Sequence, residues 1–207
     1  TIRRKGGIIL AMIGKEKIQS EVERHVLGFL EKGREDWDIP HTRAVVYYAE
    51  ELAKAAGLDV LVFVTAALFH DVGYYGLFKD TDLSQYVNVR DKKALHMLVG
   101  ARMAREFLER PEIIEYYSPE QIEQIVHLVG VHDDLGALST VEELVFMEAD
   151  TLGAIDLSRV IPTFDKDNGL KYIESLKTRR LSRFISDLGK QYATALLPAF
   201  EEYFEQM

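Results

Sequence analysis

The stretch VLVFVTAALFHDVGYYG, residues 60–76, decides the fold, because a strongly apolar segment ends there in a histidine and an aspartate. The β-branched residues of this segment would suit a strand. Its length and its pair of alanines favour a buried helix, with Asp59 as a fitting N-cap. His70 and Asp71 would then end a buried helix, where a carboxylate is costly unless a metal ion or another cation compensates its charge.

The same helical periodicity continues on both sides of this stretch. It predicts helices over about 16–30, 41–56, 91–108 and 140–155, a helix that opens at Ser118-Pro119, and a helix over 170–203 that breaks near Gly189 or Pro198. Residues 73–91 are rich in Tyr, Asp and Gly and predict a long loop of the kind that often carries function. The predicted fold class is therefore all-α, a helical bundle.

The amino-acid composition limits which metal ligands and which partners the chain can have. The chain has 207 residues, of which 47% are hydrophobic and 29% charged, as expected for one globular domain. It has no cysteine, so a metal ion would be held by His and carboxylates, and a cytoplasmic location is expected. The net charge of −9 argues against a nucleic-acid polymer as partner, but a local metal ion could still attract a small phosphorylated substrate.

The N-terminus resembles a signal peptide only faintly. Its apolar run is short, and no cleavage site of small residues follows. We interpret residues 1–14 as an N-terminal extension or vector-derived residues, with Met12 as a candidate start, and residues 15–207 as a single domain. No stretch approaches the length of a membrane span, so no membrane partner is expected.

Two further polar residues lie on faces that should be buried. His41 shares a helical face with Val45, Tyr48 and Leu52, and Asp150 follows the apolar run LVFM. Each alone has a simpler interpretation, since a core histidine can be hydrogen-bonded and Asp150 could cap a turn. Together with the His-Asp pair they indicate a shared site.

Three segments in this order resemble the HD superfamily of metal-dependent phosphohydrolases: HTRAVVYYAEELAKAAG, AALFHDVGYYG and EELVFMEADTL. The resemblance covers about Pro40 to Leu152. It implies an HD-type bundle with a metal site in its core, in which His41, His70, Asp71 and Asp150 coordinate a divalent ion. Mn, Fe, Co, Ni, Zn or Mg would suit such ligands. The ion would activate a water for attack on phosphorus, with Asp71 orienting that water.

A second ion is an open alternative. The segment HMLVGA, from His96, resembles a block of the two-metal members, and His132 resembles their fourth histidine position. His96 and His132 would then bind a second ion beside Asp71 and be catalytic, or else orient ligands or contact phosphate. His127 competes with His132 for this role.

Phosphate substrates need cationic partners as well as metal. We expect Lys79 and Arg90 to bind substrate, because they flank the long loop, and Arg43 to do so from the first segment of the resemblance. Lys92, Lys93 and the Arg179-Arg180 pair are weaker candidates. Asp133-Asp134 would position a histidine or cap a helix.

The predicted function is hydrolysis of a small phosphorylated compound, with nucleotides among the candidates, using one or two divalent ions. A diiron oxygenase on the same scaffold and a non-catalytic metal-binding sensing module are the alternatives. A homodimer is one candidate oligomeric state. No glycine-rich phosphate loop, G-x-S-x-G or H-E-x-x-H motif offers a competing chemistry.

Overall fold

A computed structural model of the chain describes residues 17–34, 36–77 and 92–207, and all regular secondary structure in these ranges is helical. The predicted all-α fold class is confirmed. After helical residues 17–30 the main elements are α2 (Asp38–Ala56), α3 (Val60–Phe69), α5 (Lys93–Leu108), α6 (Pro119–Val131), α7 (Val141–Ile155), α8 (Lys166–Ser175) and α9 (Asp187–Gln206). Short turns of helix lie at Val72–Tyr74, Ile114–Tyr116, Leu176–Arg180 and Leu181–Arg183.

Local signals in the sequence set most of these boundaries. The Asp59 side chain accepts hydrogen bonds from the backbone of Leu61 and Val62 at the start of α3. Ser118 and Thr140 begin α6 and α7 with capping boxes, in which the third helical residue returns a hydrogen bond to the cap. Gly57, at φ 68°, ends α2 in the left-handed conformation that glycine adopts without strain.

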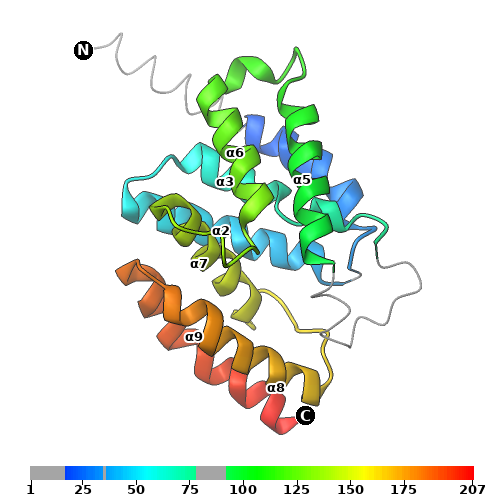
Figure 1. Cartoon of the computed structure of the whole chain (residues 1–207). Helices are drawn as coiled ribbons and strands as arrows, with labels where there is room; N and C mark the ends of the chain where they lie inside the picture. Colours follow the sequence, from blue (N-terminus) through cyan, green and yellow to red (C-terminus); the bar gives the residue numbers. More distant parts are fainter. Residues whose placement is uncertain (1–16, 35, 78–91) are drawn as a thin grey trace.

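The helix α2 packs against α3 and α7 to form the centre of the molecule, and α5 and α6 form a neighbouring pair (Figure 1). Helices α2 and α7 approach closely at Gly153, where a Cβ atom would lie 2.6 Å from Cγ2 of Val45. This approach places residue 41 on α2 near residue 150 on α7.

A second close approach lies directly after the His-Asp pair. A Cβ atom on Gly73 would lie 1.9 Å from the carbonyl oxygen of His96 and 2.7 Å from the amide nitrogen of Gly100. Only glycine fits there, so the 3₁₀ turn Val72–Tyr74 lies directly on α5. That contact brings His96 to Asp71.

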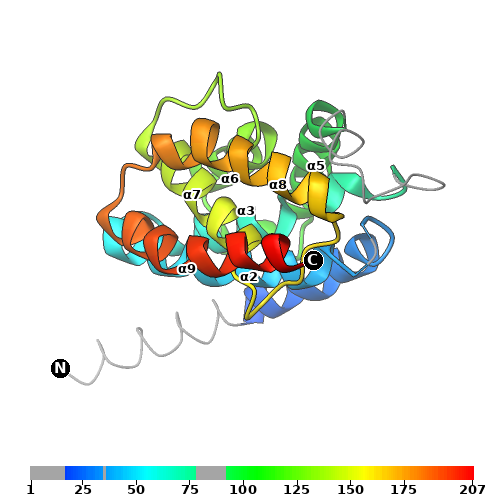
Figure 2. The same cartoon turned by 90° about the horizontal axis from the view of Figure 1, so that it is seen from below.

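The last two helices run side by side and form a layer beside the central helices (Figures 1 and 2). A helical region over 170–203 with a break near Gly189 or Pro198 was predicted, and the break lies a few residues before Gly189. Helix α8 begins four residues earlier, at Lys166, and the chain leaves helical geometry at 184–186. Pro198 lies inside α9.

The break has a tertiary cause. The buried carboxylate of Glu148 accepts hydrogen bonds from the amides of Ile185 and Ser186, at 2.5 and 3.0 Å. The side chain of Ser186 then accepts from the amide of Gly189 and starts α9. A carboxylate on α7 therefore decides where the C-terminal helices separate.

None of the helices in the described ranges is long and apolar enough to cross a membrane.

Candidate metal centre

Three side chains from three helices meet at the first candidate group. His41 lies on α2, His70 ends α3, and Asp150 lies on α7, and all three are buried. The Nε2 atom of His41 lies 3.1 Å from Oδ1 of Asp150 and 3.3 Å from Nε2 of His70. The structure thus brings together residues that lie up to 109 positions apart in the chain.

A second candidate group lies directly beside the first. His96 from α5 and His132 at the end of α6 are also buried, and their Nε2 atoms lie 3.1 Å apart. Oδ1 of Asp71 lies 3.5 Å from Nε2 of His96 and 3.9 Å from that of His132.

Asp71 connects the two groups through its two oxygens. Oδ2 lies 3.1 Å from Nε2 of His70 and 3.5 Å from Nε2 of His41, whereas Oδ1 points to His96 and His132. A carboxylate with one oxygen on each cluster has the arrangement needed to bridge two cations.

Backbone carbonyls fix two of the imidazoles in the tautomer that metal binding needs. Nδ1 of His70 donates to the carbonyl of Ala67 at 2.7 Å, and Nδ1 of His132 donates to that of Val129 at 2.9 Å. In the neutral form of each ring the proton is therefore on Nδ1, and Nε2 has its lone pair directed to the cluster.

The spacing of the donor atoms fits a shared cation. Ligands about 2.1 Å from one ion lie about 3.0 Å apart in octahedral and about 3.4 Å apart in tetrahedral geometry. The closest contacts in each group, between 3.1 and 3.5 Å, match these values. One proton cannot satisfy the several lone pairs that converge on each group, whereas a divalent ion can. Nitrogen and carboxylate donors without sulfur suit the metals expected from the sequence.

Both cluster carboxylates stay ionised despite their burial. Burial alone would raise the pKa of Asp71, but the nearby Arg34 and then His70 outweigh it and hold that pKa well below its usual range. Burial is likewise outweighed at Asp150, where Arg180 and then His41 hold the pKa well below its usual range.

The pKa values of His96 and His70 shift in opposite directions, although burial acts to lower both. Burial, together with the neighbouring His132, lowers the pKa of His96 to about 3, so this ring is a neutral donor. At His70 burial also acts against the charged form, yet the contacts with Asp71 raise the pKa to about 9. A metal ion that displaces the second proton of His70 would be attracted by the same carboxylates, Asp71 and Asp150.

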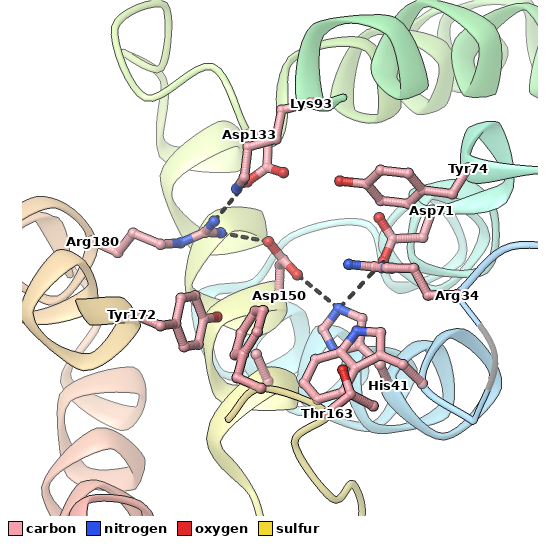
Figure 3. A pocket seen from close by; sticks show the side chains of 13 residues that line it. Arg34, His41, Asp71, Tyr74, Lys93, Asp133, Asp150, Thr163, Tyr172 and Arg180 are labelled. Carbon is pink, nitrogen blue, oxygen red and sulfur yellow. Dashed lines mark hydrogen bonds and ion pairs between the residues drawn. The ribbon is translucent and has the colours of Figure 1, made fainter. Parts of the chain in front are cut away.

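Arginine and lysine side chains surround the clusters. Arg34 donates to Asp38 at 2.6 Å and also pairs with Asp71. Arg180 donates to Asp150 at 2.5 Å and to Asp133 at 2.7 Å, so the two arginines reach the site from opposite sides (Figure 3).

The clusters form one side of a pocket. It encloses about 610 Å³ of non-atom space, including solvent at its mouth. His41, Asp71 and Asp150 reach it directly. Its other lining residues are Arg34, Trp37, Tyr74, Lys93, Asp133, Ala154, Thr163, Phe164, Tyr172 and Arg180 (Figure 3).

The structure separates the two candidate histidines of α6. His132 lies in the second group, whereas His127 is largely exposed and pairs with Glu143 at 2.6 Å. Five residues along a helix place their side chains on different faces, so His132 is the residue that reaches the site.

The predicted substrate-binding cations have different positions. Arg43 is 61% exposed, pairs with Glu23 and is not among the residues that line the pocket. Lys79 and Arg90 lie outside the described residues. The cations that line the pocket in the described ranges are Arg34, Lys93 and Arg180.

Sequence reasoning missed Arg34 and gave Lys93 and Arg180 only minor roles. Arg34 lies in a turn before the first segment of the resemblance, and no periodicity marks it. Its partner Asp38, four residues later, is the only local signal, because buried carboxylates usually have a cationic partner.

Comparisons with known proteins define the family. The HD domain model matches residues 39–155, more than half of the chain, and includes His41, the His-Asp pair, His96, His132 and Asp150. The chain belongs to the HD domain family. The family and the buried His/Asp clusters together support a metal-dependent hydrolase.

Individual relatives are distant. Ribonuclease Y of Mycoplasma mycoides is 26% identical over 134 residues, and the aligned region spans 62% of this chain but only 26% of that protein. A predicted HD superfamily hydrolase from an uncultured Thermotogales bacterium superposes with a TM-score of 0.60 at 18% identity, over 90% of this chain and 89% of its own.

Bacillus subtilis YpgQ, solved in complex with ADP, superposes with a TM-score of 0.56 at 16% identity, over 93% of this chain and 94% of its own. At this level of identity the likeness shows the fold alone.

Proposed function

We propose that this protein is a metal-dependent phosphohydrolase that acts on a small phosphorylated compound. One observation carries the proposal: Asp71 joins two buried groups of metal-ligand type, and both adjoin a pocket with cationic walls. His41, His70, Asp71 and Asp150 would hold one divalent ion, and Asp71, His96 and His132 a second.

The pocket cations support a phosphate substrate. Arg34, Lys93 and Arg180 lie on its walls, and each is already oriented by a carboxylate. Arginine forks and a lysine ammonium suit the non-bridging oxygens of a phosphate, whose charge one metal ion seldom neutralises. Lys79 and Arg90 remain candidates for the same task, and Arg43 remains a prediction that its exposed position does not support.

Bound divalent ions would lower the pKa of a water and polarise a phosphoryl oxygen. The chain's own residues supply the rest. Asp71 has an oxygen on each group and can orient the attacking water. Arg34 and Arg180, on opposite sides of the clusters, can hold the phosphate and stabilise the charge that grows on its oxygens (Figure 3).

Nucleotides are the first substrates to test. The complex of YpgQ with ADP shows that a protein of this fold accommodates one. Ribonuclease Y makes RNA a second candidate, but the net charge of −9 favours a small compound.

The test is metal analysis of the purified protein, followed by phosphate release from nucleotides, sugar phosphates and an RNA oligonucleotide. We expect metal-dependent release of phosphate from a small compound, and we expect this release to proceed in the absence of molecular oxygen. We expect His70→Ala and Asp71→Ala to abolish both metal binding and phosphate release. His127→Ala is the matched control, because His127 lies outside both groups.

Full activity in either variant would contradict the proposal. Turnover that requires oxygen and an iron pair would identify the oxygenase instead. Tight metal binding without turnover of any compound would indicate the sensing module.

A further inference from the structure

The wall of the pocket that faces the clusters comes from a part of the chain outside the family match. The HD match ends at residue 155, yet Thr163, Phe164, Tyr172 and Arg180 all line the pocket. Figure 3 shows Tyr172 on the same side of the pocket as Arg180. We call these four residues the C-terminal wall.

Buried contacts hold this wall in place. Besides its two carboxylate partners, Arg180 donates from Nε to the hydroxyl of Thr151 at 2.8 Å and from a terminal nitrogen to the carbonyl of Met147 at 3.4 Å. At Gly169 a Cβ atom would lie 2.1 Å from the ring of Phe204, so α8 and α9 are in direct contact.

The wall also has two chemically different parts. At one end the Arg180 guanidinium lies beside Asp150 and Asp133. At the other end the rings of Phe164 and Tyr172 pack with centroids 5.3 Å apart. Tyr172 also packs against the cluster of Trp37, Ala154 and Val160.

A ligand that fits both parts has a phosphate at one end and a flat, apolar group at the other. Trp37 lines the same pocket and is itself stacked on His41 at a centroid distance of 5.2 Å. An aromatic heterocycle gains from such surroundings because each ring face offers a stacking surface, whereas a sugar alone does not.

We propose that Tyr172, supported by Phe164, is the specificity-determining residue of this pocket and contacts the aromatic ring of a nucleotide, while Arg180 holds its phosphate. This inference rests on the proposed function for the placement of the phosphate. It assigns the recognition of the aromatic ring to residues 156–207, whereas the proposed metal ligands all lie within the HD match.

Binding can be tested without hydrolysis. Trp37 is the only tryptophan in the chain and lines the pocket, so its fluorescence reports occupancy. The probes are phosphonate analogues of AMP and of ribose 5-phosphate, in which a methylene replaces the ester oxygen, titrated into the metal-loaded protein. The variants are Tyr172→Leu, which keeps apolar volume but removes the ring, and Tyr172→Phe, which keeps the ring.

We expect Tyr172→Leu to weaken binding of the AMP analogue about tenfold, equivalent to ~1.4 kcal/mol, and to leave the ribose analogue within about twofold. Tyr172→Phe should bind both like the wild type. Tyr203→Leu, a tyrosine on α9 outside the pocket, is the matched control. Phe164→Leu tests the same wall if Tyr172→Leu does not fold.

Equal weakening of both probes by Tyr172→Leu, or no weakening of either with the helical content intact, would overturn the inference. Phosphate release from AMP and ribose 5-phosphate is measured separately. Its absence for both would contradict the phosphohydrolase function, whereas the titrations alone decide the role of the wall.

Discussion

At the scale of single residues, the two α6 histidines offer a direct test of the second ion. His132 touches the cluster through Nε2, and His127 does not. We expect His132→Ala to reduce the metal content from two ions per chain to one and His127→Ala to leave it unchanged. Inductively coupled plasma mass spectrometry measures both. Equal metal content in the two variants would contradict a role for His132 as a ligand.

The residues with their own local signal were predicted from the sequence. His41 shares a helical face with apolar residues, and the other three residues follow apolar runs of sequence, so the pattern predicts that all four are buried. The structure brings together His41, His70, Asp71 and Asp150. The choice between His127 and His132 required the structure, because a helical stripe does not tell which face meets a neighbour.

Arg34 was missed and Arg180 was only a minor candidate, since the positions of both side chains depend on partners elsewhere in the chain. Asp71 follows Arg34 by 37 positions, and Asp150 precedes Arg180 by 30. No local spacing shows such a pair. A buried carboxylate indicates that some cation is near but does not say which one.

At the scale of elements, Gly153 and Gly28 are a matched pair of helical glycines. Alanine at position 153 would meet Val45 at 2.6 Å, and alanine at position 28 would meet nothing within 4 Å. We expect Gly153→Ala to lower the free energy of unfolding by about 1–3 kcal/mol, through overpacking between α2 and α7. Gly28→Ala should raise it by up to about 1 kcal/mol, because alanine favours the helix.

Urea denaturation measures both changes. A stable Gly153→Ala variant would show that α2 and α7 do not depend on this close approach to place His41 beside Asp150.

The start of α7 depends on an ionised side chain. Glu143 accepts from the amides of Ser139 and Thr140 and pairs with His127. Burial acts to raise the pKa of Glu143, but these hydrogen bonds outweigh it and lower the pKa to about 2. Because the folded-state pKa is depressed, the contribution to stability is present above the unfolded value of 4.5 and is lost as pH falls towards 2.

We expect Glu143→Gln to cost about 1 kcal/mol at pH 7, as for the loss of a helix cap. The difference from wild type should shrink between pH 4.5 and pH 3. Thermal unfolding of both proteins across this range measures it. A difference that grows on acidification would contradict the assigned role of the carboxylate.

Helix identities could be predicted where apolar periodicity and capping residues agree, as in α3, α6 and α7. The boundary between α8 and α9 could not, because the carboxylate of Glu148 fixes it from another helix. The sequence predicted a break near Gly189 or Pro198, and this tertiary contact places it at residues 184–186.

At the scale of the whole molecule, five α-helices contribute histidine and aspartate side chains at or near their ends or on inner faces, so metal binding couples to folding. At a free metal concentration of about 100 times the Kd the folded state gains ~2.7 kcal/mol. For a chain of this size we expect a rise in Tm of about 5–10 °C.

Differential scanning fluorimetry with metal and with chelator measures this rise, and His70→Ala should abolish it. An equal rise in that variant would place the stabilising ion elsewhere. The single domain over 15–207 and the homodimer remain predictions.

The central claim is that side chains from three separate helices share one cation with Asp71. Anomalous diffraction from crystals soaked with Mn²⁺ tests it most directly. We predict a peak in contact with His41, His70, Asp71 and Asp150 that disappears in His70→Ala. Manganese bound at other sites with no peak among these four residues would contradict the claim.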